Sequence, residues 1–296
     1  MFTAVPADRA RPISEHLGLR GAEALARTRF RDLRWVAETG STNRDVLALA
    51  RHGAAEGTVV VADHQREGRG RQGRRWLAPP RSGLLVSVLL RPPASLAGAT
   101  TMLVAIALGE GVEAVSGCVP GLKWPNDLVI GSQDAERKLA GILAETDWPP
   151  GSTIAAGWRD PVPGEKIVVV VGAGLNVNWP RPGGDGSPEL PSDVVDRGTA
   201  LNWVTGREIG RAKLLVAFLG RLEEGYGRMV RDGSAEPVVA AWRERSATLG
   251  RRVRVDLGAD DVEGTAVDVT RDGHLVVETL EGEQRTFAVG DVVHLR

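Results

Sequence analysis

Several features that define common protein classes are missing from this chain of 296 residues. Its single cysteine, Cys118, excludes an internal disulfide and any zinc or iron–sulfur site built from cysteines. The formal net charge of −1 argues against a surface coated with positive charge for DNA or for an anionic membrane. The start of the chain lacks the apolar region of a signal peptide, and no apolar run reaches about 18 residues. These absences predict a protein of the reducing cytoplasm in which any basic function is local.

The remaining composition is that of a soluble globular protein, with 42% hydrophobic and 25% charged residues. A chain of this length can hold one large domain and a small one. Apolar runs of strand length alternate with helical segments over residues 34–247, which predicts a mixed α/β domain with a mixed sheet. After Gly250 the pattern changes to period two with frequent turn signals, which predicts a small SH3-like β-barrel over residues 248–296. Residues 1–33 then form an N-terminal extension.

Periodicity and helix breakers also predict the individual elements. The expected helices span residues 21–30, 43–53, 99–117, 206–230 and 237–246. The expected strands span residues 34–38, 57–65, 83–93, 138–146 and 166–178, and residues 121–131 read as strand, Pro turn and strand. Residues 180–193 hold too much proline and glycine for an element and are expected to form a mobile loop.

One segment between two expected strands, REGRGRQGRRWL at residues 66–77, concentrates arginine and glycine. Gly68, Gly70 and Gly73 have the G-x-G-x-x-G spacing of a dinucleotide-binding turn. That function requires a helix from the last glycine and an acidic residue about 20 positions later. The following RRWLAPPRSG and SVLLR supply neither feature. A solvated basic loop and an RNA-binding segment are the other interpretations that the composition allows.

Arginine alternating with glycine favours a loop that closes over an anion. The glycines let backbone N–H groups approach a ligand closely. The guanidinium groups present forked donors that fit phosphate or carboxylate. Because such a loop repels itself, we expect residues 66–75 to become ordered only when they bind phosphate or carboxylate.

Five further segments, taken in order along the chain, resemble the biotin protein ligase family. They are TGSTN at residues 39–43, DHQREGRGRQGRRW at 63–76, GLKWPNDL at 121–128, RKLAGILAE at 137–145 and GAGLNVN at 172–178. The resemblance runs from about Arg34 to the terminal GDVVHLR and implies a mixed α/β catalytic domain, related to lipoate ligases, with an SH3-like C-terminal domain. Some members carry an N-terminal DNA-binding domain and repress transcription. Too few residues precede Arg34 for such a domain, so no DNA partner is expected.

The resemblance implies a reaction in two steps. Biotin and ATP, the latter as its Mg²⁺ complex, form biotinyl-5′-AMP and pyrophosphate. A lysine of an acceptor protein then takes the biotin, and the family's acceptors are carboxyl carrier domains of acyl-CoA or pyruvate carboxylases. Such an enzyme works as a monomer or a weak homodimer without a membrane. Lipoate–protein ligase is the close alternative, and a non-catalytic biotin sensor or RNA-binding module is the alternative from another class.

The family's catalytic lysine corresponds to Lys138 in RKLAGIL. A compact ammonium group can contact the biotin carboxylate and the α-phosphate oxygens together. The alternative is a surface lysine before a strand. Arg69 and Arg71 resemble the loop arginines that contact the carboxylate and the phosphates in catalysis, and Gly68 closes with them over the adenylate.

The biotin site implied by the resemblance includes Ser41, Thr42 and Gln65. Hydroxyl and amide groups can satisfy both the N–H donors and the carbonyl acceptor of biotin's ureido ring in a dry pocket. Ser41 or Thr42 can also act as an ordinary helix cap. The family pattern adds Gly141 to this site, together with Gly68, Arg69, Arg71 and Lys138.

The nucleotide site implied by the resemblance comprises Arg71, Arg74, Trp76, Lys123, Asn126, Asp127, Asn176 and Arg296. Trp76 either stacks near the adenine or is simply buried. Asp127 orients Lys138 or helps to hold Mg²⁺ through phosphate oxygens, and Lys123 pairs with Asp127 or assists acyl transfer. No directly bound metal is expected, because the five histidines are scattered without metal-ligand spacing.

Overall fold

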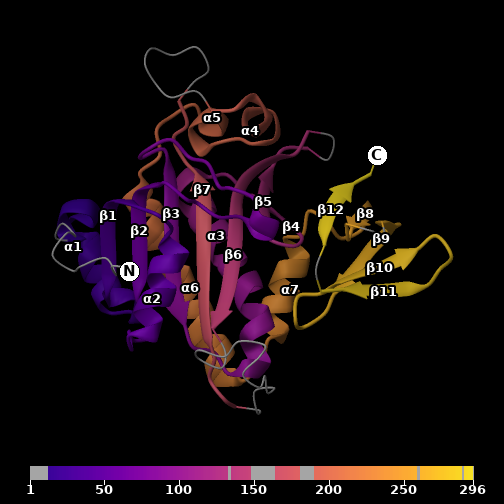
Figure 1. Ribbon diagram of the computed structural model, residues 1–296, viewed down its shortest axis with the longest axis horizontal. Helices are drawn as coiled ribbons and strands as arrows, with labels where there is room; N and C mark the ends of the chain where they lie inside the picture. Colours follow the sequence, from indigo (N-terminus) through magenta and orange to yellow (C-terminus); the bar gives the residue numbers. More distant parts are fainter. Residues whose placement is uncertain are drawn as a thin grey trace.

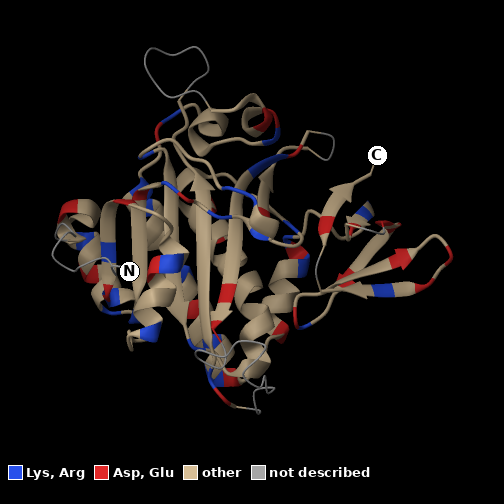
Figure 2. Ribbon diagram, viewed as in Figure 1, with Lys and Arg blue, Asp and Glu red and all other residues tan. Residues whose placement is uncertain are grey.

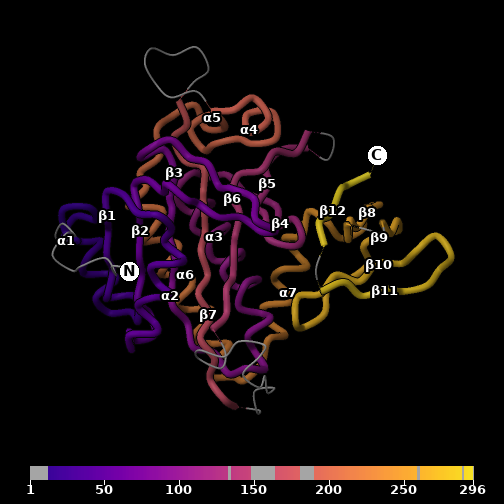
Figure 3. The backbone as a smooth tube through the Cα atoms, viewed as in Figure 1, coloured from indigo at the N-terminus to yellow at the C-terminus, as the bar shows by residue number. Residues whose placement is uncertain are grey.

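The computed structural model describes residues 13–132, 135–147, 164–180, 190–258, 261–288 and 290–295. It contains a seven-stranded mixed sheet with helices on both faces and a separate five-stranded antiparallel sheet at the C-terminal end (Figure 1). This architecture confirms the predicted fold class, a mixed α/β part followed by a small SH3-like β part. Figure 3 shows helix α7 (Glu236–Glu244) leading from the large part toward the C-terminal strands.

The large sheet has the strand order β1-β2-β3-β7-β6-β5-β4. Its strands are β1 (Leu33–Thr39), β2 (Val59–Gln65), β3 (Gly83–Leu90), β4 (Gly121–Lys123), β5 (Asp127–Ile130), β6 (Arg137–Asp147) and β7 (Val168–Asn176). Only β1 and β2 are parallel among these described strands, because helix α2 (Thr42–Arg51) carries the chain back between them. All eight residues of β3 are buried in the middle of the sheet.

Alternation along the strands assigns each helix to one face of the sheet. Val59 and Val61 of β2 point into the main core with α3 (Ala97–Ser116) and α6 (Arg211–Asp232), whereas Val60 between them packs with α2. On β7, Val168 and Val170 continue the α2 face. The next positions on that face are Gly172, Gly174 and Asn176, so this part of the sheet face carries no apolar side chains from β7. The functional site lies at this end of the sheet.

Helix α3 is the one described helix long and apolar enough to cross a membrane by composition alone. In this fold it is a core helix, because 72% of its most apolar window is buried. It packs on α6 so closely that a Cβ at Gly111 would lie 2.9 Å from the backbone nitrogen of Phe218. The length and period of both helices were predicted from the sequence.

The structure differs from the sequence expectations where elements are short or begin early. Helix α1 spans Ile13–Ala26 and so begins before the predicted residue 21. Helices α4 (Ser192–Arg197) and α5 (Leu201–Thr205) were not predicted, because six and five residues are too few to show a helical period. Most of the predicted loop at residues 180–193 lies outside the described residues.

The C-terminal sheet has the order β11-β10-β9-β8-β12. Its strands are β8 (Arg252–Asp256), β9 (Asp261–Val269), β10 (Leu275–Thr279), β11 (Gln284–Phe287) and β12 (Asp291–His294). Trp124, which is 3% exposed, joins the two sheets: its backbone N–H donates to Thr248 Oγ1 at 3.0 Å. Its indole N–H donates to the Gly273 carbonyl at 2.9 Å. The β4–β5 turn therefore holds the C-terminal strands beside the large sheet.

The α3–α6 contact should be a main source of stability. Phe218 is 1% exposed, and replacing it with alanine leaves a cavity that close-packed neighbours cannot fill. We expect Phe218→Ala to lower the free energy of unfolding by about 3–5 kcal/mol in urea denaturation. Arg231→Ala, at an exposed position of the same helix, should change it by less than about 0.5 kcal/mol. Equal losses in the two variants would contradict this assignment of the core.

Candidate functional site

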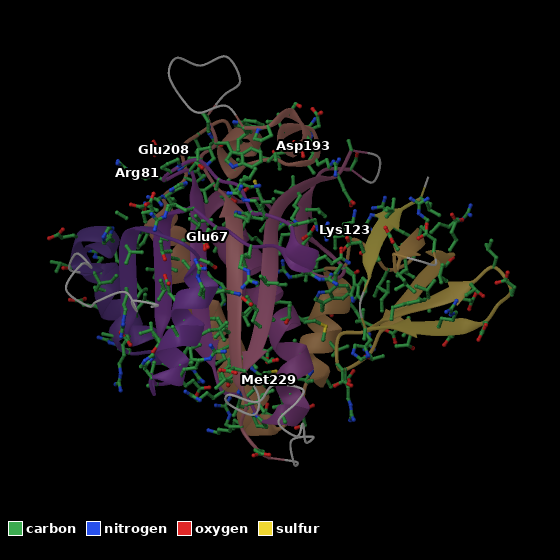
Figure 4. All side chains as sticks on the ribbon, in the orientation of Figure 1. Glu67, Arg81, Lys123, Asp193, Glu208 and Met229 are labelled. Atoms are coloured by element: carbon green, nitrogen blue, oxygen red, sulfur yellow. The ribbon has the colours of Figure 1, made fainter. Side chains whose placement is uncertain are left out.

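A cavity of about 720 Å³ opens on the sheet face opposite α3 and α6. It is bounded by the start of α2, the glycine–arginine loop, the β4–β5 turn, strands β6 and β7, helix α4 and strand β12. Figure 4 labels two of its borders, Lys123 beside the C-terminal strands and Asp193 on α4. Figure 2 shows basic residues on the segment that crosses this end of the sheet.

Glycines on the two central strands make room for the cavity. The indole of Trp76, from the glycine–arginine loop, lies across Gly141 of β6 and Gly174 of β7. A Cβ at these positions would lie 2.9 Å and 2.5 Å from the indole ring. A Cβ at Gly172 would likewise collide with Asn43 Oδ1. Side chains at these glycine positions would therefore project from the sheet into the space that the cavity and the indole occupy.

The polar end of the cavity is built at the start of α2. The backbone N–H and the hydroxyl of Thr42 both lie within hydrogen-bond distance of Gln65 Oε1, at 2.7 and 3.1 Å. Ser87 donates to Thr42 Oγ1 and, in an alternative or shared bond, to Asn43 Oδ1, each at 2.7 Å. Ser41 occupies the N-cap position and is 2% exposed, but its side chain makes no capping hydrogen bond. These groups present fixed donors and acceptors beneath the pocket.

Sequence reasoning missed Ser87 and Asn43 at this end. The available signal for Ser87 was a single hydroxyl inside the apolar run GLLVSVLL, where a buried polar group needs a partner. Asn43 Nδ2 donates to the Leu143 carbonyl at 3.1 Å and to Glu145 Oε2 at 2.8 Å. The polar end is therefore tied to β6 as well as to β2.

Lys138 stands at the start of β6, with its ammonium nitrogen 2.7 Å from Asp127 Oδ1. The same nitrogen lies 5.5 Å from the centroid of the Trp76 ring. The antiparallel pairing of β5 and β6 brings Lys138 and Asp127 together, and 38% of the Lys138 side chain remains exposed. Asp127 and Lys138 thus form an ion pair, and the two roles predicted for Asp127 stay predictions.

Lys123 pairs with Glu136 at 2.6 Å rather than with Asp127, which corrects one of its two predicted roles. Glu136 also lies 3.2 Å from Arg251 and 2.9 Å from His294. Burial acts to raise the pKa of Glu136, but the hydrogen bonds from His294 and Lys123 and the charge of Lys123 outweigh it and hold the pKa at about 2. Burial lowers the pKa of His294, against the effect of Glu136. Sequence reasoning missed this cluster because its members are far apart in the chain.

The glycine–arginine loop is a small hairpin. Gly70 N–H donates to the Arg74 carbonyl at 2.7 Å, and Trp76 N–H donates to the Gly68 carbonyl at 2.9 Å. Its turn contains Gln72 at φ 53° and Gly73 at φ 74°, the left-handed region that glycine adopts without strain. A Cβ at Gly68 would collide with the Trp76 carbonyl, so glycine is required at the base of the hairpin.

The arginines of the loop contact partners from other elements. Arg69 lies 3.2 Å from Glu145 on β6, and Arg74 lies 2.7 Å from Asp291 on β12. Arg71 donates to the Gly290 carbonyl at 3.2 Å, and burial lowers its pKa. These partners offset the mutual repulsion that the sequence suggests. The expectation that an anion orders the loop stays a prediction.

The two predicted asparagines have different surroundings. Asn126 donates to the Ile142 carbonyl at 2.6 Å, so its side chain fixes the turn to β6. Asn176 is 3% exposed and donates to the Thr199 carbonyl at 3.0 Å. Its Oδ1 atom has no hydrogen-bond partner among the described residues and belongs to a side chain that lines the cavity. Asn176 thus retains an acceptor for a ligand, whereas Asn126 is already engaged.

The structure brings most of the predicted site residues around this one cavity. Those that line it are Ser41, Thr42, Gln65, Arg69, Arg71, Arg74, Trp76, Lys123, Asn126, Asp127, Lys138, Gly141 and Asn176. Gly68 lies at the base of the hairpin instead, and Arg296 falls outside the described residues. Their individual roles stay predictions.

Comparison with known proteins identifies the family. Residues 36–155 match the Biotin/lipoate A/B protein ligase family, and residues 248–295 match the Biotin protein ligase C terminal domain. The chain is also 36% identical to a biotin–[acetyl-CoA-carboxylase] ligase of Mycobacterium tuberculosis, over 98% of each protein. The chain belongs to the biotin protein ligase family.

Two further relatives support this assignment. The bifunctional ligase/repressor BirA of Bacillus subtilis is 30% identical over 84% of this chain and 70% of the relative. A biotin protein ligase from Aquifex aeolicus, solved in complex with biotin and ATP, superposes with a TM-score of 0.68. It is 27% identical, over 90% of this chain and 100% of that one. The resemblance drawn from the five sequence segments is therefore confirmed.

The Glu136 cluster should make stability sensitive to acid. The pKa of Glu136 is about 2 in the folded protein against an ordinary 4.5. A lowered folded-state pKa contributes stability that is present above pH 4.5 and is lost as the pH falls toward 2. In calorimetry between about pH 6 and pH 3, the Tm of the wild type should fall more steeply than that of Glu136→Gln. Parallel slopes would show that this carboxylate does not govern the acid sensitivity.

Proposed function

We propose that this chain is an ATP-dependent biotin protein ligase that forms biotinyl-5′-AMP and transfers biotin to a lysine of a carboxyl carrier domain. One observation carries the proposal: a polar pocket over bare glycines opens directly onto a group of cations. Thr42 and Gln65 form the polar end, and Lys138 stands at the cationic end. A relative at 36% identity is named as a ligase acting on acetyl-CoA carboxylase.

In the first step a carboxylate oxygen of biotin attacks the α-phosphorus of ATP. The bond between that phosphorus and the β-bridging oxygen breaks, and pyrophosphate leaves with the bond's electron pair. Two anions must approach each other, so the site must supply positive charge where they meet. Lys138, Arg69 and Arg71 line the same cavity and can supply it.

In the second step the amine of an acceptor lysine attacks the acyl carbon of the adenylate. The bond from that carbon to the AMP oxygen breaks, AMP leaves, and the nitrogen loses a proton as the amide forms. Water would destroy the mixed anhydride, so the adenylate must be shielded until the amine arrives. The hairpin at residues 66–77, with Trp76 lying on the sheet, is the element that can cover it.

The acids beside these cations define the electrostatics of binding. Asp127 holds Lys138 at 2.7 Å, and Glu145 holds Arg69 at 3.2 Å. An incoming phosphate or carboxylate competes with these partners for charge-assisted hydrogen bonds. We propose that Mg²⁺ enters as the complex with ATP, bound through phosphate oxygens. Asp127 is the cavity carboxylate nearest to Lys138 for phosphate-bound Mg²⁺.

We propose the finer assignments on the same basis. Residues 1–33 form the extension, residues 34–247 the catalytic domain and residues 248–296 the C-terminal domain. The acceptor is a carrier domain of an acyl-CoA or pyruvate carboxylase, and the enzyme acts in the cytoplasm as a monomer or weak homodimer without DNA. The hydrogen-bonding groups of Thr42 and Gln65 favour biotin over lipoate, because lipoate has no ureido ring to pair with them.

Lys138→Ala tests the catalytic assignment. With radiolabelled biotin, MgATP and a purified carrier domain, the wild type should transfer label to the carrier. Lys138→Ala should slow pyrophosphate release by orders of magnitude, because the ammonium that joins the two anions is lost, while its Tm stays near that of the wild type. Lys213→Ala, at an exposed position on α6, should behave as the wild type. Normal pyrophosphate release by Lys138→Ala would refute the role.

Gly68→Ser tests the covering hairpin. The new side chain would collide with the Trp76 carbonyl and open the hairpin base. We expect biotinyl-AMP to escape and to label lysines of a bystander such as serum albumin several times more than the wild type does. Gly220→Ser is the matched control, because a Cβ at Gly220 meets nothing within 4 Å. A Gly68→Ser enzyme that labels only the carrier domain would count against the proposal that the hairpin covers the adenylate.

A further inference from the structure

One carboxylate at the edge of the cavity connects both sheets. Glu136 precedes β6, and its side chain is 14% exposed. Its partners come from three other places: Lys123 ends β4, Arg251 precedes β8, and His294 ends β12. The Arg251 and His294 side chains are 15% and 5% exposed. The cluster is therefore much more deeply buried than the ion pairs of the hairpin arginines.

The carboxylate divides its two oxygens among these partners. Oε1 accepts from Lys123 Nζ at 2.6 Å and lies 2.9 Å from His294 Nδ1, and Oε2 accepts from Arg251 Nη1 at 3.2 Å. The other ring nitrogen of His294 lies 3.3 Å from Thr248 Oγ1, the hydroxyl that also accepts from the Trp124 backbone. Glu136 thus fixes both the end of β4 and the end of β12.

Strand β12 in turn holds the hairpin. Asp291, its first residue, accepts two hydrogen bonds from Arg74 at 2.9 and 2.7 Å. The preceding Gly290 carbonyl accepts from Arg71 at 3.2 Å. His294 anchors the far end of this four-residue strand to Glu136. The position of one partly buried carboxylate therefore affects three cations that line the cavity: Lys123 directly, and Arg71 and Arg74 through β12.

The charges of the cluster explain why this carboxylate matters. Lys123 and Arg251 are like charges that share one carboxylate, so the two positive charges and one negative charge leave a net charge of +1 with His294 neutral. Removing the negative charge takes away the carboxylate that lies between the Lys123 ammonium and the Arg251 guanidinium, so that these two like charges repel each other. Lys123 and β12 would both move. The hydrogen bonds of Thr42 and Ser87 at the polar end of the pocket go instead to Gln65, Thr42 and Asn43.

We propose that Glu136 is a positioning residue for the nucleotide, acting through Lys123 and β12, and that it leaves biotin binding unaffected. The inference rests on the proposed ligase function. In this proposal, residues at the start of α2 bind biotin, and the Glu136 cluster positions the residues that bind the triphosphate. Each of the two binding functions can therefore be impaired without the other.

Glu136→Gln is the direct test, since it removes the charge and keeps the shape. We expect the KM for MgATP in adenylate formation to rise about tenfold or more, as for loss of one partner of a buried ion pair. The Kd for biotin, measured by calorimetry without nucleotide, should stay within about twofold of the wild type. If Glu136 only stabilised the fold, the substitution would weaken the binding of biotin and of MgATP together.

Two controls separate positioning from general damage. Glu263→Gln also removes one negative charge, but from an exposed ion pair with Arg252 within the C-terminal sheet. It should leave the KM for MgATP and the Kd for biotin unchanged. His294→Asn supplies an amide donor near the position of Nδ1 and should bind MgATP better than His294→Ala. The His294 pair also decides the question if Glu136→Gln does not fold.

The outcomes distinguish this inference from the proposed function. A wild-type protein that binds no biotin and releases no pyrophosphate would contradict the ligase function itself. A wild type that does both, with a Glu136→Gln variant whose KM for MgATP matches that of Glu263→Gln, would overturn the positioning role alone. An equal loss of biotin and MgATP affinity, or equal MgATP binding by His294→Asn and His294→Ala, would also overturn it.

Discussion

The pairing of the central cations of the cavity, Lys138, Arg69 and Arg74, with protein carboxylates is the constraint on which the rest of the site depends. Joining two anions requires positive charge at one point, and like cations crowded in a half-buried pocket repel one another. The fold solves this by placing a carboxylate from another element beside each of these three cations. Asp127 meets Lys138 at 2.7 Å, and Asp291 meets Arg74 at 2.7 Å. The cations are thus held in place and can exchange their partners for ligand oxygens.

The two sheets have different tasks in this arrangement. Gly141 and Gly174 on the large sheet have no side chain, and this lets the indole of Trp76 lie against the strands. The C-terminal sheet supplies anchors at the rim, through Asp291 for the hairpin and His294 for Glu136. Trp124 holds the two sheets together by hydrogen bonds from its backbone and its indole. A change in the small sheet can therefore alter the position of the hairpin arginines at the cavity.

Much of the fold follows from the sequence because long elements carry a clear period. The eight buried residues of β3 and the long helix α6 were predicted in place, whereas α5, with five residues, has no period to detect. At the site, short motifs predicted many of the residues that surround the cavity, because those residues lie in a few contiguous segments of the sequence. Their partners were missed, because Glu136 and His294 meet only through the packing of two sheets. Of the two roles predicted for Lys123, pairing with Asp127 was wrong for the same reason.

The most direct measurement is a crystal structure of this protein bound to a non-hydrolysable analogue of biotinyl-AMP. The account predicts that Lys138 has left Asp127 for the ligand, with Arg69 and Arg71 within hydrogen-bond distance of ligand oxygens and the hairpin at residues 66–77 covering the adenylate. A structure in which the Lys138–Asp127 pair persists and residues 66–75 point into solvent, away from the bound analogue, would contradict it.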